Sequence, residues 1–474
     1  MPPQDIPARV SSPVLLIELG GASYDVLIPM AEALRLPNLG RLLQSSALVR
    51  LEGGGPWNPV TARATMETGL GPAAHGRFDS HYLDHRRRRV VAWGDATLPG
   101  PTLTDVVTEA DADVPVRQVL DVASGETIWR RKPTGFEELS LGIAKTKTAI
   151  RRALAAAERI DRAGPWRLLR VRFAVFDSLL HRLWHLLGIG DGPGGNRRWV
   201  AKTQEAFQTL DGCLGGLLGL AGRRAAAVAV VSPYGFGPFC EKITLSELLR
   251  QRDLLHVARG GAMVTYRARR MAWKCRRWVH PQQDRQRPVG GILPIDWRRS
   301  RAVTLHGDSA ALVYLNTPER FAQRTLTTAA QREQALADAA AALAGARHPS
   351  TAEPLFGKID LVAERFGVDP VRHCLPDVVA VPAAGFCTRH RLDRNRHVMR
   401  SDPSLSGIRT EGGLLMVRAP DVQAGRSLTA ELHDVAPTVL ELLGIPPHAG
   451  MTGRALIAFF APVGVLENSP AIYR

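Results

Sequence analysis

Two side chains near the middle of the chain have residue types and a spacing that suit metal binding. Asp177 and His181 are four positions apart, which is about one helical turn and lets both side chains reach one point. Because zinc accepts carboxylate oxygens and imidazole nitrogens, the pair could form half of a one-metal site. The alternative is structural, with Asp177 capping a helix and His181 in the first turn of that helix. Since two ligands rarely hold zinc tightly, the sequence favours the structural alternative.

A second candidate for function is a basic segment at residues 262–278. Its apolar side chains recur at roughly helical spacing, with Arg and Lys elsewhere, at Val264, Met271, Cys275 and Trp278. A basic amphipathic helix can lie on an anionic membrane or contact nucleic acid. The alternative, which the apolar periodicity favours, is a helix that packs this stripe on the protein core. No zinc finger, RNA-binding aromatic signature or Walker loop indicates a dedicated nucleic-acid module.

The net charge of the chain is its one unusual total. Lys and Arg together number 61 against 45 acidic residues, which gives +16, and only seven of the basic residues are Lys. The charge is compatible with a solvated basic surface, since net charge governs association rather than fold. It is also compatible with an acidic partner, such as a phosphorylated small molecule, an acidic protein or an anionic lipid surface.

Length and composition indicate a large globular protein. The 474 residues are 45% hydrophobic and 22% charged, which is enough to bury a sizeable core. No run of eighteen apolar residues occurs, so no transmembrane segment is predicted. Residues 1–13 contain no apolar signal-peptide core. The five scattered cysteines favour reduced thiols, and hence a cytoplasmic protein that could be peripheral to a membrane; they are Cys213, Cys240, Cys275, Cys374 and Cys387.

Strands and helices alternate along most of the chain. Buried strands are predicted at residues 14–19, 168–176 and 225–231, and long helices at about 136–163 and 198–220. This alternation is typical of an α/β fold with an open, doubly wound, mostly parallel sheet. The alternation of strands and helices is interrupted after Pro238, and it resumes with strands at 377–381 and 413–417. We therefore predict a core of residues 12–238 and 356–456, an inserted cap subdomain at 239–355 and a tail at 457–474.

Several short segments, in this order, resemble the alkaline phosphatase superfamily, and within it the type I phosphodiesterase/nucleotide pyrophosphatase branch. They begin with the strand and glycine turn at 14–22 and the segment LPNL at 36–39. They continue with TGLGPAAHG at 68–76, SPYGFGP at 232–238, IDW at 295–297 and VYLN at 313–316. They end with DVAPTVL at 434–440, GIP at 444–446 and MTGR at 451–454. The resemblance implies a three-layer α/β/α sandwich.

The resemblance also implies a reaction. Members of this family hydrolyse phosphate esters with two metal ions, usually zinc, and with a Thr or Ser hydroxyl as the nucleophile. Two cations close together stabilise the attacking and the leaving oxygen of an in-line displacement. The ligands expected there are carboxylates and imidazoles.

At most of the positions that align with the family's site residues, this chain has a different residue type. The first metal Asp falls on Gly20, the nucleophile on Pro59, and the late His on Ile408. The Asp-His pair of the fourth strand's turn falls on Pro233 and Tyr234. Only Asp177 and His181 match the family pattern.

Neighbouring residues could substitute for the lost groups. Asn58 and Thr61 flank the nucleophile position, but an activated hydroxyl needs a base or a metal, and Thr61 with Thr65 is better explained as a helix cap. Arg63 and Arg409 could bind an anionic group. Four further residues could be recruited as metal ligands but are better explained as structural or exposed: Glu18, Glu67, His185 and His397.

The sequence thus favours a degenerate phosphodiesterase-like protein that has lost metal-dependent catalysis and acts in binding or scaffolding. It would hold no metal, or one divalent ion, most readily zinc. The alternative is a phosphohydrolase acting on a phosphate ester through Asp177, His181 and recruited ligands. A third possibility, a basic membrane-surface or nucleic-acid binder, is based on charge alone.

Overall fold

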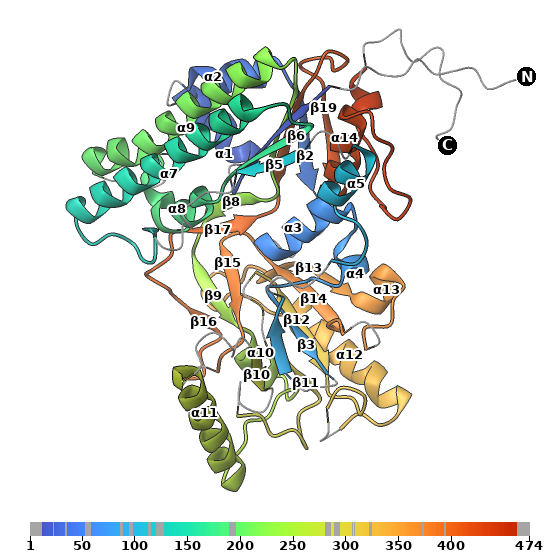
Figure 1. The fold of residues 1–474 in the computed structure, drawn as a ribbon. Helices are drawn as coiled ribbons and strands as arrows, with labels where there is room; N and C mark the ends of the chain where they lie inside the picture. The colour runs from blue at the N-terminus through green and yellow to red at the C-terminus, as the bar shows by residue number, and fades with distance from the viewer. Residues whose placement is uncertain are drawn as a thin grey trace, which may run out of the picture.

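The structure is a computed structural model of the chain (Figure 1). It describes residues 12–461, apart from residues 22, 34–35, 53–57, 86–88, 94–97, 112–114, 120–127, 189–195, 280–285, 289–293, 306, 308, 322–324, 372–373 and 393–394.

A seven-stranded sheet forms the centre of the larger part of the molecule, with strand order β19-β2-β18-β7-β1-β6-β5. β18 is antiparallel to both of its neighbours, and the other strand pairs are parallel. The mostly parallel sheet predicted from the sequence is therefore confirmed. The strands are β1 (Val14–Leu19), β2 (Ala47–Glu52), β5 (Val116–Val119), β6 (Leu168–Phe173), β7 (Ala227–Ser232), β18 (Gly413–Arg418) and β19 (Ser427–Glu431).

Helices cover both faces of this sheet, because alternate residues of its buried strands point to opposite sides. Leu15 and Ile17 of β1 pack in one hydrophobic cluster, and Val14 and Leu16 pack in the other. The first cluster includes α1 (Tyr24–Ala33), α2 (Pro37–Gln44), α7 (Phe136–Ala163), α8 (Val175–Leu183) and α9 (Arg197–Arg223). The second includes α3 (Pro59–Thr68), α5 (Leu103–Ala110) and α14 (Val435–Leu442). The three-layer sandwich is confirmed (Figure 1).

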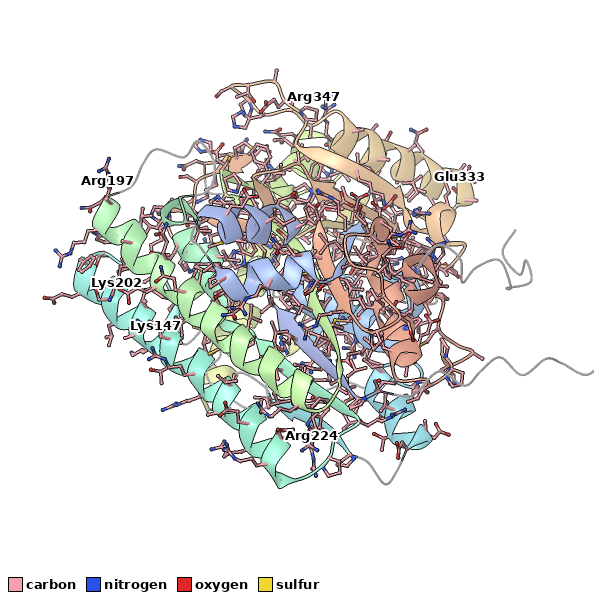
Figure 2. All side chains as sticks on the ribbon, turned by 90° about the horizontal axis from the view of Figure 1, so that it is seen from above. Lys147, Arg197, Lys202, Arg224, Glu333 and Arg347 are labelled. Atoms are coloured by element: carbon pink, nitrogen blue, oxygen red, sulfur yellow. The ribbon has the colours of Figure 1, made fainter. Side chains whose placement is uncertain are left out.

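The two longest helices, α7 and α9, lie side by side on the outside of the first layer (Figure 2). Glu205 of α9 binds both Lys147 of α7, at 2.7 Å, and Lys202, at 2.8 Å. Such partly exposed pairs contribute little to stability. The packing of the two helices therefore depends mainly on their buried apolar stripes.

A second, four-stranded antiparallel sheet lies beside the first part, with strand order β11-β12-β14-β13. One of its faces packs on α10 (Leu245–Gln251) and α12 (Ala329–Ala344). Its other face packs on Phe78, Leu83 and Val90, from the region of β3 (His81–Asp84) and β4 (Arg89–Ala92). The strands are β11 (Ala302–Val303), β12 (Ala311–Leu315), β13 (Phe356–Leu361) and β14 (Val378–Pro382). The insertion boundary predicted at residue 355 thus falls inside this sheet.

Short strands connect the two parts. β8 (Gly235–Pro238) pairs with β17 (Gly407–Thr410). β9 (Glu241–Thr244) pairs with β15 (Phe386–Arg389) and β16 (Met399–Arg400). The remaining short elements are α4 (Pro72–His75), η1 (Trp184–Leu186), β10 (Gln286–Pro288), α13 (Val362–Phe366), η3 (Leu432–Asp434) and η4 (Ile457–Phe460). The predicted tail starts at residue 457. Within its first four residues, Ile457 and Phe460 are buried against the core.

The basic segment forms α11 (Gly261–Val279), close to the helix predicted at 262–278. The prediction that its apolar stripe packs on the core is wrong for Val264 and Met271, whose side chains are 66% and 62% exposed. The helix extends away from both sheets (Figure 1), so no core surface covers them.

Two observations bear on the predicted class of protein. Among the described helices, none is both long enough and apolar enough to cross a membrane. All five cysteines are described, and none of them is in a disulfide.

A matched pair of helix glycines tests the packing of the first helical layer. A methyl group at Gly142 of α7 would collide with the buried ring of Trp129, whereas one at Gly212 of α9 would meet no atom within 4 Å. We expect Gly142→Ala to lower the free energy of unfolding by about 1–3 kcal/mol through overpacking. Gly212→Ala should raise it by up to about 1 kcal/mol through helix propensity. Chemical denaturation measures both, and equal effects would contradict the packing described.

Candidate functional site

A cavity of 230 Å³, here called the inner pocket, lies at the carboxyl ends of β1, β6 and β7. Ligands of doubly wound sheets commonly bind at this edge. The structure brings together there five residues singled out in the sequence. They are the family-matched positions Gly20, Pro59, Asp177, Pro233 and Tyr234; Glu18, Arg63 and Arg409, also singled out in the sequence, line the pocket as well, and Met66, Arg172, Ala174 and Ser178 complete the lining.

A larger cavity of 780 Å³, here called the outer cleft, adjoins the inner pocket and shares Pro59 and Arg409 with it. His181 and Ile408 line the outer cleft rather than the inner pocket. Its lining also includes Asn58 of the sandwich and residues 381–388, which run from the end of β14 into β15. The outer cleft therefore lies between the sandwich and the second sheet.

Arg409 binds Asp177 with two hydrogen bonds, both from one edge of its guanidinium group. Arg409 Nε donates to Asp177 Oδ1 at 2.7 Å, and a terminal nitrogen of Arg409 donates to Oδ2. The Tyr234 hydroxyl also donates to Oδ1, at 3.0 Å, and the Arg409 guanidinium lies 5.5 Å from the centre of the Tyr234 ring. Pairing of β17 with β8 positions Arg409 opposite Phe236 and close to Tyr234. Both carboxylate oxygens of Asp177 are therefore occupied by groups of the protein.

The strand that leads to Asp177 ends earlier than the sequence predicts. β6 ends at Phe173 and α8 begins at Val175, with Ala174 as its N-cap residue. Asp177 thus lies within the first turn of α8, and the prediction that Asp177 caps this helix is wrong. His181 is in the last turn of α8, so the side chains face one another across one turn, with His181 Nε2 3.9 Å from Asp177 Oδ2.

The charges of this cluster fix its protonation. Burial raises the pKa of Asp177, but the neighbouring Arg409 and His181 groups and the hydrogen bonds from Arg409 and Tyr234 together outweigh burial, and the pKa is about 2. Burial also raises the pKa of the Tyr234 hydroxyl, and the adjacent Asp177 carboxylate raises it further. Near neutral pH the cluster therefore contains a carboxylate, a guanidinium cation and a neutral phenol.

His181 is neutral in the same range. Its Nδ1 donates to the backbone carbonyl of Gly407 at 2.9 Å, and its ring lies edge-on to Phe236. Burial and the Arg409 charge lower the pKa of His181 to about 4. An imidazole with so low a pKa is a weak general base.

Comparison with protein families supports the resemblance described above. The chain matches the family described as type I phosphodiesterase / nucleotide pyrophosphatase over residues 14–288, which is more than half of its length. The protein belongs to this family. The family is part of the alkaline phosphatase superfamily, and the matched region contains the turns at 14–22, 68–76 and 232–238. The comparison with curated proteins finds no match.

The residues in the inner pocket do not fit the two metal ions that the family implies. Gly20, Pro59 and Pro233 have no side-chain donor, and Ile408 is apolar. A Cβ atom at Gly20 would lie 3.3 Å from Asp177 Cβ, so a carboxylate there would be close to the remaining ligand, but the position has none. Among the described residues, no group of three or more His, Cys, Asp and Glu side chains could hold a metal ion. We therefore derive no metal-dependent step.

The two candidates beside the nucleophile position have structural partners. Asn58 is the N-cap of α3 and accepts from the backbone N–H groups of Val60 and Thr61. Its Nδ2 donates to the Thr61 hydroxyl at 2.7 Å, and Thr61 is 1% exposed. The interpretation of Thr61 as the helix cap is thus wrong, because Asn58 has this role. Pro59 is at the start of α3, where the missing N–H costs nothing.

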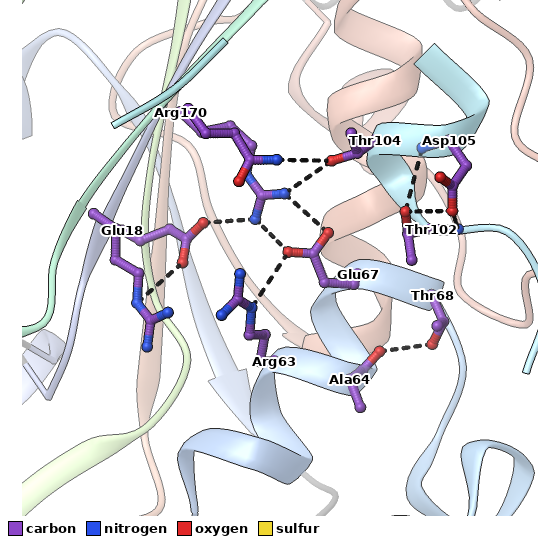
Figure 3. Close-up of polar contacts among 11 residues, drawn as sticks. Glu18, Arg63, Ala64, Glu67, Thr68, Thr102, Thr104, Asp105 and Arg170 are labelled. Atoms are coloured by element: carbon purple, nitrogen blue, oxygen red, sulfur yellow. Dashed lines mark hydrogen bonds and ion pairs between the residues drawn. The ribbon is translucent and has the colours of Figure 1, made fainter. Parts of the chain in front are cut away.

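Two of the possible recruited ligands belong to a buried ion-pair network (Figure 3). Arg170 of β6, whose side chain is 5% exposed, donates to Glu18 Oε1 at 2.7 Å and to Glu67 Oε2 at 2.9 Å. Removing one partner of such a pair would leave a buried charge without compensation. Glu18 and Glu67 are thus engaged by Arg170. His185 is in η1 outside the inner pocket, and His397 lines a different cavity.

Arg63 and Arg172 differ from Arg170 in their exposure and pairing. Their side chains are 43% and 29% exposed, and their carboxylate partners are distant. Arg63 Nε lies 3.9 Å from Glu67 Oε1, and Arg172 Nε lies 4.0 Å from Glu18 Oε2. These separations exceed a hydrogen bond. Arg63 and Arg409, the predicted anion-binding residues, thus line one cavity together with Arg172, which the sequence reading missed.

The buried imidazole of His181 should make stability depend on pH. The unfolded chain binds a proton at His181 as the pH falls from about 6.5 to 4, whereas the folded chain does not, because its pKa is about 4. The free energy of unfolding should therefore fall as the pH is lowered through this range. His181→Gln should flatten this part of the profile, measured by denaturant unfolding at a series of pH values.

The exposed residue His448 supplies the control for this measurement. His448→Gln should leave the profile like that of the parent protein. His75 is also buried, with a pKa lowered by burial to about 3, and contributes equally to all three proteins. A His181→Gln profile that parallels the parent between pH 4 and 6.5 would contradict the neutral assignment.

Proposed function

We propose that this protein is a catalytically inactive member of its family, which binds a phosphorylated small molecule in the inner pocket. The observation that carries the proposal is the Arg409–Asp177 pair. A guanidinium cation occupies both oxygens of the one carboxylate that matches the family's metal ligands. A metal ion at Asp177 would therefore lie beside the Arg409 cation and would compete with it for the carboxylate.

The lost nucleophile supports inactivity independently. The covalent route that the family implies needs an activated Thr or Ser hydroxyl at this position. Pro59 has no hydroxyl, and the nearby Thr61 is buried and bonded to Asn58. His181 could act as a base only weakly, because its pKa is about 4.

The charges that remain favour an anion. The inner pocket and its supporting network contain four guanidinium groups, and these face three carboxylates, those of Glu18, Glu67 and Asp177. Arg409 is matched by Asp177, and Arg170 lies between the two glutamates. Arg63 and Arg172 thus keep N–H donors that no short carboxylate contact occupies. Guanidinium groups bind phosphate oxygens with paired hydrogen bonds.

The outer cleft provides room for the rest of such a ligand. Its volume of 780 Å³ lies in the range of small-molecule sites. Phe386 and Val381 lie in its lining with Lys242 and Lys358, which pair with Asp402 and Asp360, so the cleft offers both polar and apolar surface. The proposed ligand therefore has a phosphate group at one end and a larger organic group at the other.

Binding of inorganic phosphate and of 4-nitrophenyl phosphate tests this proposal. Because a hydrogen bond to a charged group contributes about 1.5–3 kcal/mol, we expect Arg63→Gln/Arg172→Gln to weaken binding at least about tenfold. Isothermal titration calorimetry at low salt measures the dissociation constants. The melting temperature of the variant shows whether it is folded.

The control for this experiment replaces two arginines far from the pocket. Arg151 and Arg152 are exposed on α7, so Arg151→Gln/Arg152→Gln changes the net charge equally. This control should bind phosphate like the parent. Equal affinity of the pocket variant and the parent would exclude the inner pocket as the binding site.

A separate measurement tests inactivity. Aryl phosphodiesters and phosphomonoesters should be hydrolysed at the background rate, and added zinc, manganese or magnesium should not raise it. Elemental analysis should find no stoichiometric metal in the purified protein. A metal-stimulated rate that disappears in both Asp177→Asn and His181→Gln would replace the proposal with the alternative, a phosphohydrolase with recruited ligands.

The cytoplasmic location predicted from the sequence stays a prediction. We propose no cofactor for the protein.

A further inference from the structure

Helix α11 presents an apolar surface that the rest of the protein does not cover. Val264 and Met271 are two of the four large hydrophobic side chains that are exposed in the described part of the chain. They are seven positions apart in the chain, so they lie on the same face of the helix, two turns apart. Figure 1 shows α11 extending from the end of the molecule that holds the second sheet, with open space along its length.

The same helix is strongly basic. Its 19 residues include six Arg or Lys and no Asp or Glu. The side chains of Arg267 and Arg270 are exposed, as is that of Arg259 just before the helix. Arg267 and Arg270 lie between Val264 and Met271 along the helix, so cationic and apolar groups share its free surface.

We propose that α11 binds the interface of an anionic membrane, with Val264 and Met271 inserted among the lipid chains. Its length of about 28 Å, at 1.5 Å per residue, suits a helix that lies in the plane of the interface. Basic groups are attracted by anionic headgroups, and apolar side chains on the same helix add the hydrophobic contact. A nucleic acid would use the charges but not the two apolar side chains, and this difference favours lipid.

Vesicle binding tests the proposal. The full-length protein is sedimented with vesicles of phosphatidylcholine alone or of phosphatidylcholine mixed with phosphatidylglycerol. We expect binding only to the mixed vesicles, and weaker binding as salt is raised. Arg267→Gln/Arg270→Gln should weaken binding on the order of tenfold. Val264→Ser/Met271→Ser should also weaken it, although it leaves the charge unchanged.

Matched variants on α7 control for general changes in charge and apolar surface. Arg151→Gln/Arg152→Gln removes the same number of charges, and Leu141→Ser removes a side chain that is 57% exposed. Both variants should bind the mixed vesicles like the parent. Because none of these residues lines the inner pocket, phosphate binding should be unchanged throughout, so that failure here would leave the proposed function standing.

Three outcomes would overturn the proposal. The parent protein could fail to bind the mixed vesicles. The apolar pair could be replaced without effect while binding to heparin or DNA depends on the arginines, which would indicate a polyanion site. Alternatively, Val264→Ser/Met271→Ser could change the oligomeric state measured by light scattering without changing vesicle binding, which would indicate contact with a second copy of the chain.

Discussion

The buried ion pair between Arg409 and Asp177 is the interaction on which the rest of the site depends. A carboxylate at the meeting point of three parallel strands needs a nearby cation, because an uncompensated buried charge is costly. In the family that the chain belongs to, metal ions are expected to supply this charge. Here a guanidinium group supplies it, and the same charge, together with burial, keeps His181 neutral. Since the two side chains are 20% and 16% exposed, losing either partner would leave the other largely buried, at a cost below the roughly 3–5 kcal/mol of a fully buried pair.

Arginine also balances the neighbouring carboxylates. Arg170 lies between Glu18 and Glu67, each of which would otherwise be a buried anion. In both clusters the guanidinium group makes several short contacts to carboxylates: Arg409 contacts both oxygens of Asp177, and Arg170 contacts both glutamates. Arg63 and Arg172 at the edge of this arrangement have only distant carboxylate partners, and these are the two groups that we propose bind an added anion. The charges that balance the buried carboxylates and the charges proposed to bind a ligand thus come from different arginines of one cluster.

Features that depend on local pattern were predictable from the sequence. The strand at 14–19 and the helix at 136–163 have the predicted bounds, since apolar runs and periodicity mark them. The Arg409–Asp177 pair joins residues 232 positions apart, and no local pattern reveals such a contact. Arg172 had a signal that was missed, because Arg170 and Arg172 alternate in an otherwise apolar strand and must therefore share a face. The pairing of β12 with β14 is also non-local. The sequence pattern from which the boundary at residue 355 was predicted therefore could not show that the second sheet continues beyond it.

The replaced positions show that the backbone shape of a turn and the donor atoms needed for catalysis are independent requirements. The turns shared by the family need a particular backbone conformation. Catalysis needs, in addition, a side-chain donor atom at these positions. Pro59 keeps the shape, since the start of a helix accepts proline without losing a hydrogen bond. Gly20 likewise directly follows β1 beside Asp177, where a small residue leaves the strand ends close together. Both positions thus lack the donor atoms that the family's metal site implies, while the strand and the helix beside them are intact.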